Sequence, residues 1–161
     1  MLKYFGTRVR LPPPPPYKFV RALSKVIFNK MNIARILIIA DARETVDELR
    51  DFFELNGFET EVALNAKVAF AILGERRMDL AIIGFKVQDT PGLEVLANVR
   101  GIDPFLPAVI INGSNSKKIK SMIIKAGAQG YIPKPIEWAP FLNKVRKVLA
   151  SHVRKVVQSR L

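Results

Sequence analysis

ARILIIADARETVDELRDFFELNG, residues 34–57, decides the fold because a short isoleucine-rich run is followed directly by a helical pattern. The run from Ile33 to Ile39 is apolar except for Arg35 and too short for a helix, which is typical of a strand covered on both faces. From Arg43 to Asn56 the pattern is helical, and Gly57 stands where helices commonly end. The apolar residues at helical spacing are Val46, Leu49, Phe52, Phe53 and Leu55. This stretch predicts one strand, one helix and a glycine stop.

The same unit recurs along the chain. Further strands are expected at Glu59–Leu64, Asp79–Ile83, Ala108–Ile111 and Gly130–Ile132, and further helices at Ala66–Arg76, Gly92–Arg100, Ser116–Ala126 and from Ile136 onward. Alternation at this spacing predicts parallel strands joined by right-handed helical crossovers, since tight hairpins cannot link parallel neighbours. The expected fold class is α/β, with a doubly wound five-stranded parallel sheet in a three-layer α/β/α sandwich.

In a doubly wound sheet, ligands bind beyond the carboxyl ends of the strands. The segments expected there are 40–43, 84–92, 112–116 and 133–135. Candidate functional residues should therefore come from these four segments. No glycine-rich phosphate loop, serine nucleophile elbow, histidine pair or paired catalytic carboxylates occurs at a meaningful spacing.

Four motifs at these strand ends carry a family resemblance. They are ARILIIADAR at 34–43, DLAIIGFKVQDTPGLEV at 79–95, PAVIINGS at 107–114 and AGAQGYIPKP at 126–135. In order and spacing they resemble the receiver domain of bacterial two-component response regulators, over roughly residues 33–150. The resemblance implies a flavodoxin-like, receiver-like sheet and a role in phosphorelay signal transduction. It also implies a cis peptide bond before Pro135.

The departures from the resemblance are concentrated in its chemistry. A working receiver would place an acidic pair at 40 and 41, an acceptor aspartate at 84, a serine or threonine at 112 and a lysine at 134. This sequence has Ala40, Asp41, Gly84, Asn112 and Lys134 at those positions. Phosphoryl transfer to a receiver needs a carboxylate nucleophile and a cation held by several oxygens. We therefore expect a degenerate, atypical pocket with no catalytic residue, metal or cofactor, and no enzyme activity.

Two further expectations concern this pocket. Lys134 would ordinarily pair with the acceptor, so here it should either pair with Asp41 or turn to solvent, and we favour the pair. Asp89, five positions after Gly84, is the nearest alternative phosphoacceptor but should not share the end-of-strand geometry.

The positive charge of the chain is concentrated at its ends. The net charge is +12, yet residues 1–32 carry seven basic and no acidic residues and residues 141–161 carry six and none. We divide the chain into a basic extension (1–32), a receiver-like domain (33–150) and a basic continuation of the last helix (151–161). The extension holds five prolines, Pro12–Pro16, typical of a spacer or, as the less favoured alternative, of an SH3-type ligand. A basic amphipathic helix is expected from Tyr17 to Asn32.

Both ends offer surfaces for partners. The N-terminal helix could pack on the domain, dock on a partner, lie on an anionic membrane or belong to a targeting sequence. The apolar stripe of the last helix should outrun the domain and need a cover from the N-terminal helix, a second subunit or another protein. The expected interaction surface is Tyr131, Leu142, Val145, Leu149, Val153 and Val156. The basic-tail residues are Lys18, Arg21, Lys25, Lys144, Arg146, Lys147, Arg154 and Lys155.

Composition narrows the function classes. Without cysteine there are no disulfides, thiolate zinc sites or cysteine nucleophiles. No apolar run approaches the roughly 18–20 residues that span a bilayer. The leading hypothesis is a phosphorylation-independent pseudo-receiver in the cytoplasm that acts through protein–protein interaction, with homodimerisation as one form. The alternatives are a regulator tethered to nucleic acid or an acidic membrane by its basic tails, with peripheral membrane association, and an unconventional phosphoacceptor.

Overall fold

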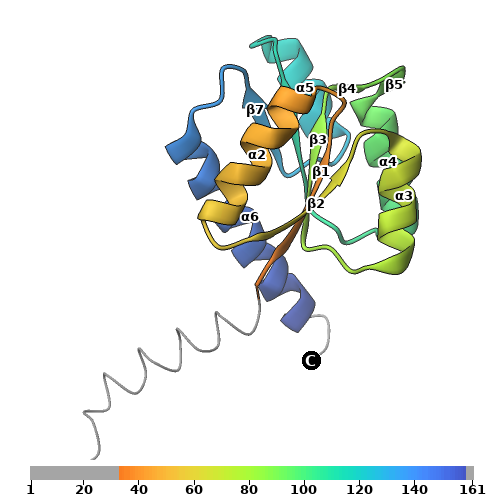
Figure 1. Ribbon diagram of the computed structural model, residues 1–161, viewed down its shortest axis with the longest axis vertical. Coiled ribbons are helices and arrows are strands. Elements are labelled where there is room, and N and C mark those ends of the chain that lie inside the picture. Colours follow the sequence, from red (N-terminus) through yellow and green to blue (C-terminus); the bar gives the residue numbers. More distant parts are fainter. Residues whose placement is uncertain (1–32, 159–161) are drawn as a thin grey trace, which may run out of the picture. The chain divides into compact units, whose positions relative to one another are not determined.

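The computed structural model describes residues 33–158, with side chains described as far as His152. Within this range a parallel sheet of five strands alternates with five helices (Figure 1). The sheet strands are β1 (Arg35–Ile39), β2 (Glu59–Ala63), β3 (Leu80–Gly84), β6 (Ala108–Asn112) and β7 (Gly130–Pro133). The helices are α2 (Arg43–Leu55), α3 (Ala66–Glu75), α4 (Gly92–Ile102), α5 (Lys117–Lys125) and α6 (Trp138–Gln158). The predicted fold class is confirmed.

The strand order, β2-β1-β3-β6-β7, creates one point where the winding reverses. From β1 the chain moves outward to β2, then returns to β3 on the other side of β1 and continues to β6 and β7. The crevice between the carboxyl ends of β1 and β3 is therefore the usual ligand position in such a sheet. Residues 40–41 and Gly84 lie there.

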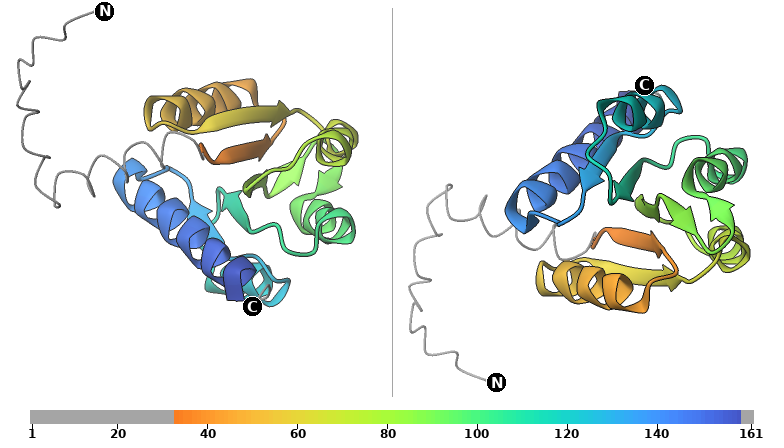
Figure 2. Two further views of the ribbon diagram at one scale, coloured as in Figure 1. Left: turned by 90° about the horizontal axis from the view of Figure 1, so that it is seen from below. Right: turned by 90° about the horizontal axis from the view of Figure 1, so that it is seen from above.

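Two apolar layers cover the sheet. On one face α2 and α6 bury Val46, Phe53 and Phe141 against β1, β3 and β6, and on the other face α3, α4 and α5 bury residues such as Val95 and Ile123. Figure 2 shows α2 and α6 on one side of the sheet and α3 and α4 on the other. The central strands are buried on both sides, which explains their nearly continuous isoleucine, leucine and valine content.

An aromatic cluster joins α2 to α6. The rings of Phe52 and Trp138 lie 4.6 Å apart between centroids, and those of Phe53 and Phe141 lie 5.5 Å apart in an edge-to-face arrangement. Aromatic pairs at such distances add to the stabilisation from buried area. The expectation that Leu55 shares this apolar face is wrong, because its side chain is 87% exposed. Leu55 lies nine positions after Val46, which turns it to the opposite side of the helix.

A short antiparallel hairpin that the sequence analysis missed interrupts the predicted loop after β3. It consists of β4 (Lys86–Val87) and β5 (Thr90–Pro91), and its turn residue Gln88 has a φ of 53°. The start of α4 packs directly against the loop, because a Cβ at Gly92 would lie only 2.2 Å from the carbonyl oxygen of Gly84. Glycine is therefore required at position 92.

Several predicted features lie outside the described residues. These are the spacer and amphipathic helix of residues 1–32, with Lys18, Arg21 and Lys25, and the side chains of Val153, Arg154, Lys155 and Val156. The backbone of α6 is helical to Gln158. Within the part of the chain that the structure describes, no helix combines the length and apolar character needed to span a bilayer.

Candidate functional site: the carboxyl-end cavity

The carboxyl ends of the central strands surround a cavity of about 270 Å³, which we call the carboxyl-end cavity. All five residues of the predicted pocket line it: Ala40, Asp41, Gly84, Asn112 and Lys134. Four different strand ends contribute them, so the parallel topology brings together residues as much as 94 positions apart in sequence. The peptide bond between Lys134 and Pro135 is cis, as the family resemblance implied.

Asp41 is the single carboxylate among the residues that line the cavity. Its Oδ2 accepts a hydrogen bond of 2.8 Å from the backbone N–H of Gln88 in the β4–β5 turn. This contact explains why a hairpin with an unfavourable positive φ at Gln88 is held over the sheet edge. The carboxylate therefore has a structural partner in the folded protein.

Lys134 does not form the predicted pair with Asp41. Its Nζ donates a hydrogen bond of 3.0 Å to the Oγ1 of Thr45 in the first turn of α2, and the three ion pairs found among the described residues do not include it. The lysine is exposed, so its ammonium remains hydrated and does not need a counter-ion. The favoured expectation was wrong, and the solvent-facing arrangement holds.

Small residues form the inner wall of the cavity at positions 40 and 84. A Cβ built on Gly84 would lie 3.6 Å from the Cβ of Ala40 and 3.2 Å from the carbonyl oxygen of Lys86. Asn112 is 7% exposed, and its Nδ2 donates a 3.3 Å hydrogen bond to the carbonyl oxygen of Ser114. A Cβ at position 84 would therefore be closely packed, and Gly84 lines the cavity with backbone beside the polar groups of Asp41, Asn112 and Lys134.

Three residues of this region were not among those predicted from the sequence. Thr45 and Lys86 line the cavity, and Gln88 holds Asp41. Thr45 lies in the first turn of α2, directly after the end of β1, so its place at the start of the predicted helix could have suggested that it is near the site. The turn at Gln88 carries no glycine that would have signalled its positive φ.

The donor set does not suit a divalent cation. Mg²⁺ requires several oxygen ligands in nearly octahedral geometry. The cavity offers one carboxylate, with one of its oxygens already bonded to a backbone amide. Among the described residues, no group of three or more histidine, aspartate or glutamate side chains is placed to hold a metal ion.

A second, larger hollow lies between β7 and α6. This β7–α6 groove has a volume of about 790 Å³. Apolar side chains such as Ile132, Phe141 and Val148 line it, together with Lys144 and Lys147. Figure 1 places these two elements next to each other at one edge of the sheet.

The expected interaction surface needs correction at two positions. Val145 is completely buried against the sheet, and Tyr131 is 5% exposed with its hydroxyl hydrogen-bonded to the carbonyl oxygen of Ser114. Leu142 and Leu149 are half-buried, and Leu149 packs on the core. Much of the apolar stripe of α6 is therefore covered by the domain itself, because that helix face packs on the sheet.

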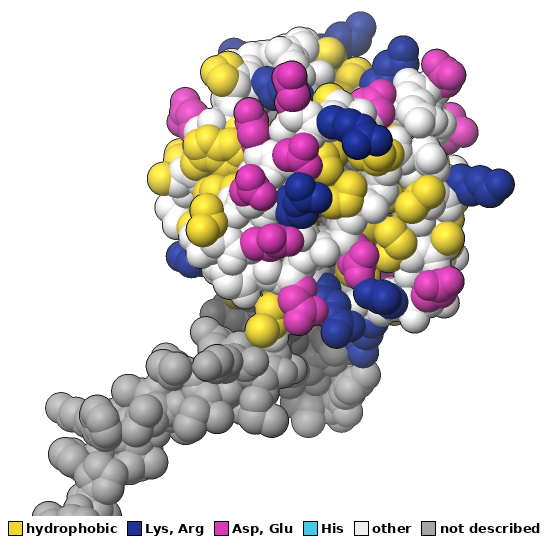
Figure 3. Space-filling view, viewed as in Figure 1, with side chains coloured by type: hydrophobic (Ala, Val, Ile, Leu, Met, Phe, Trp, Pro, Cys, Tyr) yellow, Lys and Arg dark blue, Asp and Glu magenta, His cyan; other side chains and the backbone are white. Residues whose placement is uncertain are grey.

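Charge is distributed unevenly over the described domain. Residues 34–102 hold 8 basic and 12 acidic side chains, whereas residues 103–152 hold 8 basic and 2 acidic ones. Acidic side chains gather on the face shown in Figure 3. The helix α2 contains five acidic residues, Glu44, Asp47, Glu48, Asp51 and Glu54. The α5–β7–α6 side is positively charged by the lysines of α5 and by Lys144, Arg146 and Lys147.

Comparison with known proteins now identifies the family. The model of the response regulator receiver domain matches residues 36–146. The chain therefore belongs to the response regulator receiver domain family. Domains of this family are generally signalling modules of two-component systems rather than enzymes.

Individual relatives agree with this assignment. The chain is 29% identical over 115 residues to the response regulator MprA of Mycobacterium tuberculosis, covering 71% of this chain and 50% of the relative. The MprA of Mycolicibacterium vanbaalenii is 28% identical with the same coverage. The chain thus spans about half the length of these curated relatives.

Solved structures show the same fold. A CheY-like receiver domain protein from Methanospirillum hungatei superimposes with a TM-score of 0.71 at 27% identity, covering 77% of this chain and 99% of that one. NtrX from Brucella abortus gives a TM-score of 0.75 at 25% identity, covering 80% of this chain and 29% of NtrX.

Proposed function

We propose that this chain is a phosphorylation-independent pseudo-receiver, a member of the receiver family that signals by binding a protein partner. The observation that carries the proposal is the composition of the carboxyl-end cavity. Glycine stands at the end of β3, where the family resemblance implies the acceptor aspartate, and Asp41 is the single carboxylate of the lining.

The chemistry of phosphorylation supports this proposal. A carboxylate must attack the phosphoryl group while a cation neutralises the developing charge. Asp41 is engaged with the N–H of Gln88, and Gly84 offers no nucleophile. Asp89 is exposed in the turn of the β4–β5 hairpin and does not line the cavity. An unconventional phosphoacceptor is therefore the weaker alternative.

The experiment is intact-mass measurement after incubation with a small acyl phosphate and Mg²⁺. We expect the mass to remain unchanged under conditions that label an ordinary receiver domain run in parallel. A stoichiometric, acid-labile phosphoryl adduct would overturn the proposal.

The β7–α6 groove is the surface we assign to the protein partner. Its apolar lining can bury apolar side chains, and Lys144 and Lys147 favour a partner segment that also carries acidic groups. A second copy of the chain is one such partner, because the α2 side is acidic. Sedimentation equilibrium over a salt series tests this, since a charge-driven homodimer should dissociate as salt rises. Dimers that persist unchanged at high salt would contradict a charge-driven contact.

A second candidate function is tethering to a polyanion. The observation that favours it is the net charge of +12, together with the positive α5–β7–α6 side. Anisotropy of a labelled mixed-sequence nucleic acid should then fall steeply as salt rises. Absence of binding at low salt would remove this candidate for nucleic acid. The same contact with an anionic membrane would place the protein at a membrane surface from the cytoplasmic side.

A further inference from the structure

We propose that the carboxyl-end cavity binds a small aliphatic monocarboxylate, whose carboxylate group is held by Lys134 and whose alkyl chain lies against the inner wall near Gly84. This inference rests on the proposed pseudo-receiver function, because a phosphoryl group or a divalent cation would occupy the same space. It goes beyond that function by giving the cavity a ligand of its own.

The carboxyl-end cavity is large enough for a small ligand. The cavity measures about 270 Å³, room for a ligand of several non-hydrogen atoms. Its inner wall is apolar, formed by Ala40, Leu49, Ile82 and Ile111 beside Gly84. A Cβ at position 84 would lie 3.6 Å from the Cβ of Ala40 and 3.2 Å from the carbonyl oxygen of Lys86, so glycine keeps this part of the wall free of a side chain. A short alkyl chain fits such a wall better than a fully polar anion does.

The charged residues that line the cavity favour an anionic ligand. Lys86 and Lys134 line the cavity, and Asp41 is the one acidic residue there, so the lining is net positive by one charge. Lys134 donates one hydrogen bond to a neutral hydroxyl, Thr45 Oγ1, which leaves further ammonium protons for an anion. An ammonium–carboxylate hydrogen bond is roughly twice as strong as a neutral one.

The remaining polar groups favour a single negative charge. Asn112, at 7% exposure, presents its side-chain amide on the cavity wall, and an amide can donate to a carboxylate oxygen. Asp41 is an acidic residue on the same cavity wall, so a phosphate, which carries about two charges near neutral pH, meets more repulsion than a monoanion. A short monocarboxylate satisfies Lys134 and Asn112 at the lower electrostatic cost.

The test is a titration of the full-length protein with propionate, followed by amide chemical shifts at constant ionic strength. Saturable shifts should appear around Gly84 and Asn112. Propionamide, a neutral analogue of the same shape, should bind at least roughly tenfold more weakly because it cannot pair with the ammonium. Equal responses to propionate and propionamide, or tighter binding of inorganic phosphate, would overturn the inference.

Matched variants locate the site. Lys134→Met should reduce propionate affinity roughly tenfold or more, whereas Lys125→Met removes the same charge from exposed α5, outside the cavity, and should leave it unchanged. Gly84→Asp should abolish binding by filling the space with a tethered carboxylate. Equal loss in both lysine variants would show a general charge effect and contradict the site.

The same samples separate this inference from the proposed function. An acyl phosphate adduct on wild-type protein refutes both. An unmodified protein that shows no saturable response to propionate refutes the ligand and leaves the pseudo-receiver proposal standing.

Discussion

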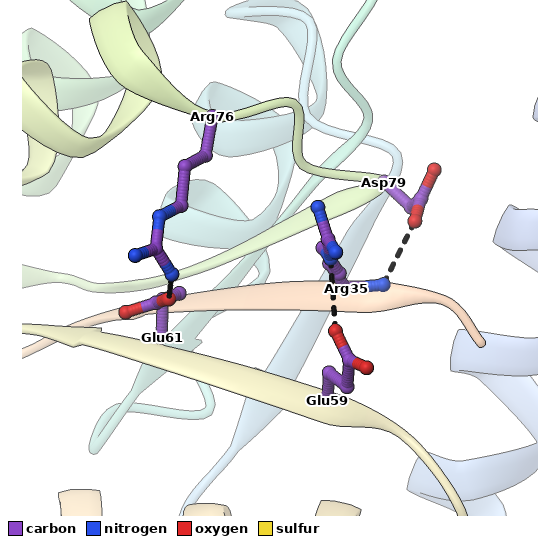
Figure 4. Close-up of polar contacts among 5 residues, drawn as sticks. All are labelled: Arg35, Glu59, Glu61, Arg76 and Asp79. Atoms are coloured by element: carbon purple, nitrogen blue, oxygen red, sulfur yellow. Dashed lines mark hydrogen bonds and ion pairs between the residues drawn. The ribbon is translucent and has the colours of Figure 1, made fainter.

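Charged residues at the two ends of the parallel sheet have different kinds of bonding partner. At the amino end, Arg35 Nε pairs with Glu59 at 2.8 Å, its backbone N–H donates to Asp79 at 2.7 Å, and Arg76 pairs with Glu61 (Figure 4). At the carboxyl end, Asp41 and Lys134 bond to uncharged groups. Charged groups at the amino end pair with one another across neighbouring elements. Asp41 and Lys134 at the carboxyl end line a cavity and have no charged partner among the described residues, so they can still bind a ligand there.

This difference separates structural from functional roles. The pairs at the amino end are solvent-exposed, with 49% and 53% exposure for Arg35 and Glu59, so they contribute little stability although they join β1 to β2. The hydrogen bond from Arg35 to Glu59 and the opposite charge of Glu59 raise the pKa of Arg35. The carboxyl end depends instead on close backbone packing and on one carboxylate that holds a hairpin.

The largest effect is expected from Gly92→Ala at the carboxyl end. The new Cβ would lie 2.2 Å from the Gly84 carbonyl oxygen, so α4 or the loop must move, and we expect a loss of about 3 kcal/mol in unfolding free energy. Urea denaturation measures it. The matched control is Gly74→Ala in α3, where nothing lies within 4 Å and a gain of up to ~1 kcal/mol is expected. Similar midpoints for the two variants would contradict the packing account.

A smaller effect is expected from Asp41→Ala. Removing the acceptor of the Gln88 N–H should destabilise the β4–β5 hairpin by about 1 kcal/mol. Hydrogen exchange should show faster exchange of the Gln88 amide and little change in the central strands. Asp89→Ala, in the same turn but not bonded to that amide, serves as the control. Unchanged protection of Gln88 would mean that Asp41 does not hold the hairpin.

The smallest effect is expected at the amino end. A double-mutant cycle with Arg35→Met and Glu59→Gln should give a coupling energy close to zero at physiological salt, since both groups are exposed and screened. Thermal unfolding of the four proteins measures it. A strong coupling that salt does not weaken would show that the amino end is more than a set of surface pairs.

A half-buried guanidinium provides an intermediate case beside these two ends. Arg100 in α4 donates to the carbonyl oxygens of Leu106 and Gly127 at 2.6 and 2.8 Å and to Gln129 Oε1 at 2.9 Å. Burial lowers the pKa of Arg100 from its usual value. This arginine ties the end of α4 to the loops before β6 and β7, a role that its position in the sequence did not reveal.

The fold could be predicted because its signals are local. Isoleucine-rich runs such as residues 36–39 and the following amphipathic helix each report their own structure, and parallel order follows from their alternation. The pocket residues could be placed because the resemblance assigns them to strand ends. Side-chain partners could not, since the choice of Lys134 between Asp41 and Thr45 depends on hydration and rotamers.

The burial of the last helix shows another limit. A helical stripe such as Leu142, Val145 and Leu149 indicates an apolar face but not what covers it. The domain's own sheet covers Val145 completely, so this member of the stripe is core and not partner surface. The β7–α6 groove could not be predicted from the sequence, because it forms only where β7 and α6 lie next to each other in the fold.

The most direct test of the central claim is the amide spectrum of the wild-type protein before and after adding Mg²⁺ and a small acyl phosphate. The account predicts unchanged resonances for Asp41, Gly84, Gln88 and Asn112, because the cavity has neither an acceptor at position 84 nor a suitable set of metal ligands. Concerted shifts of these amides that require both reagents, and that spread to β7, would contradict it.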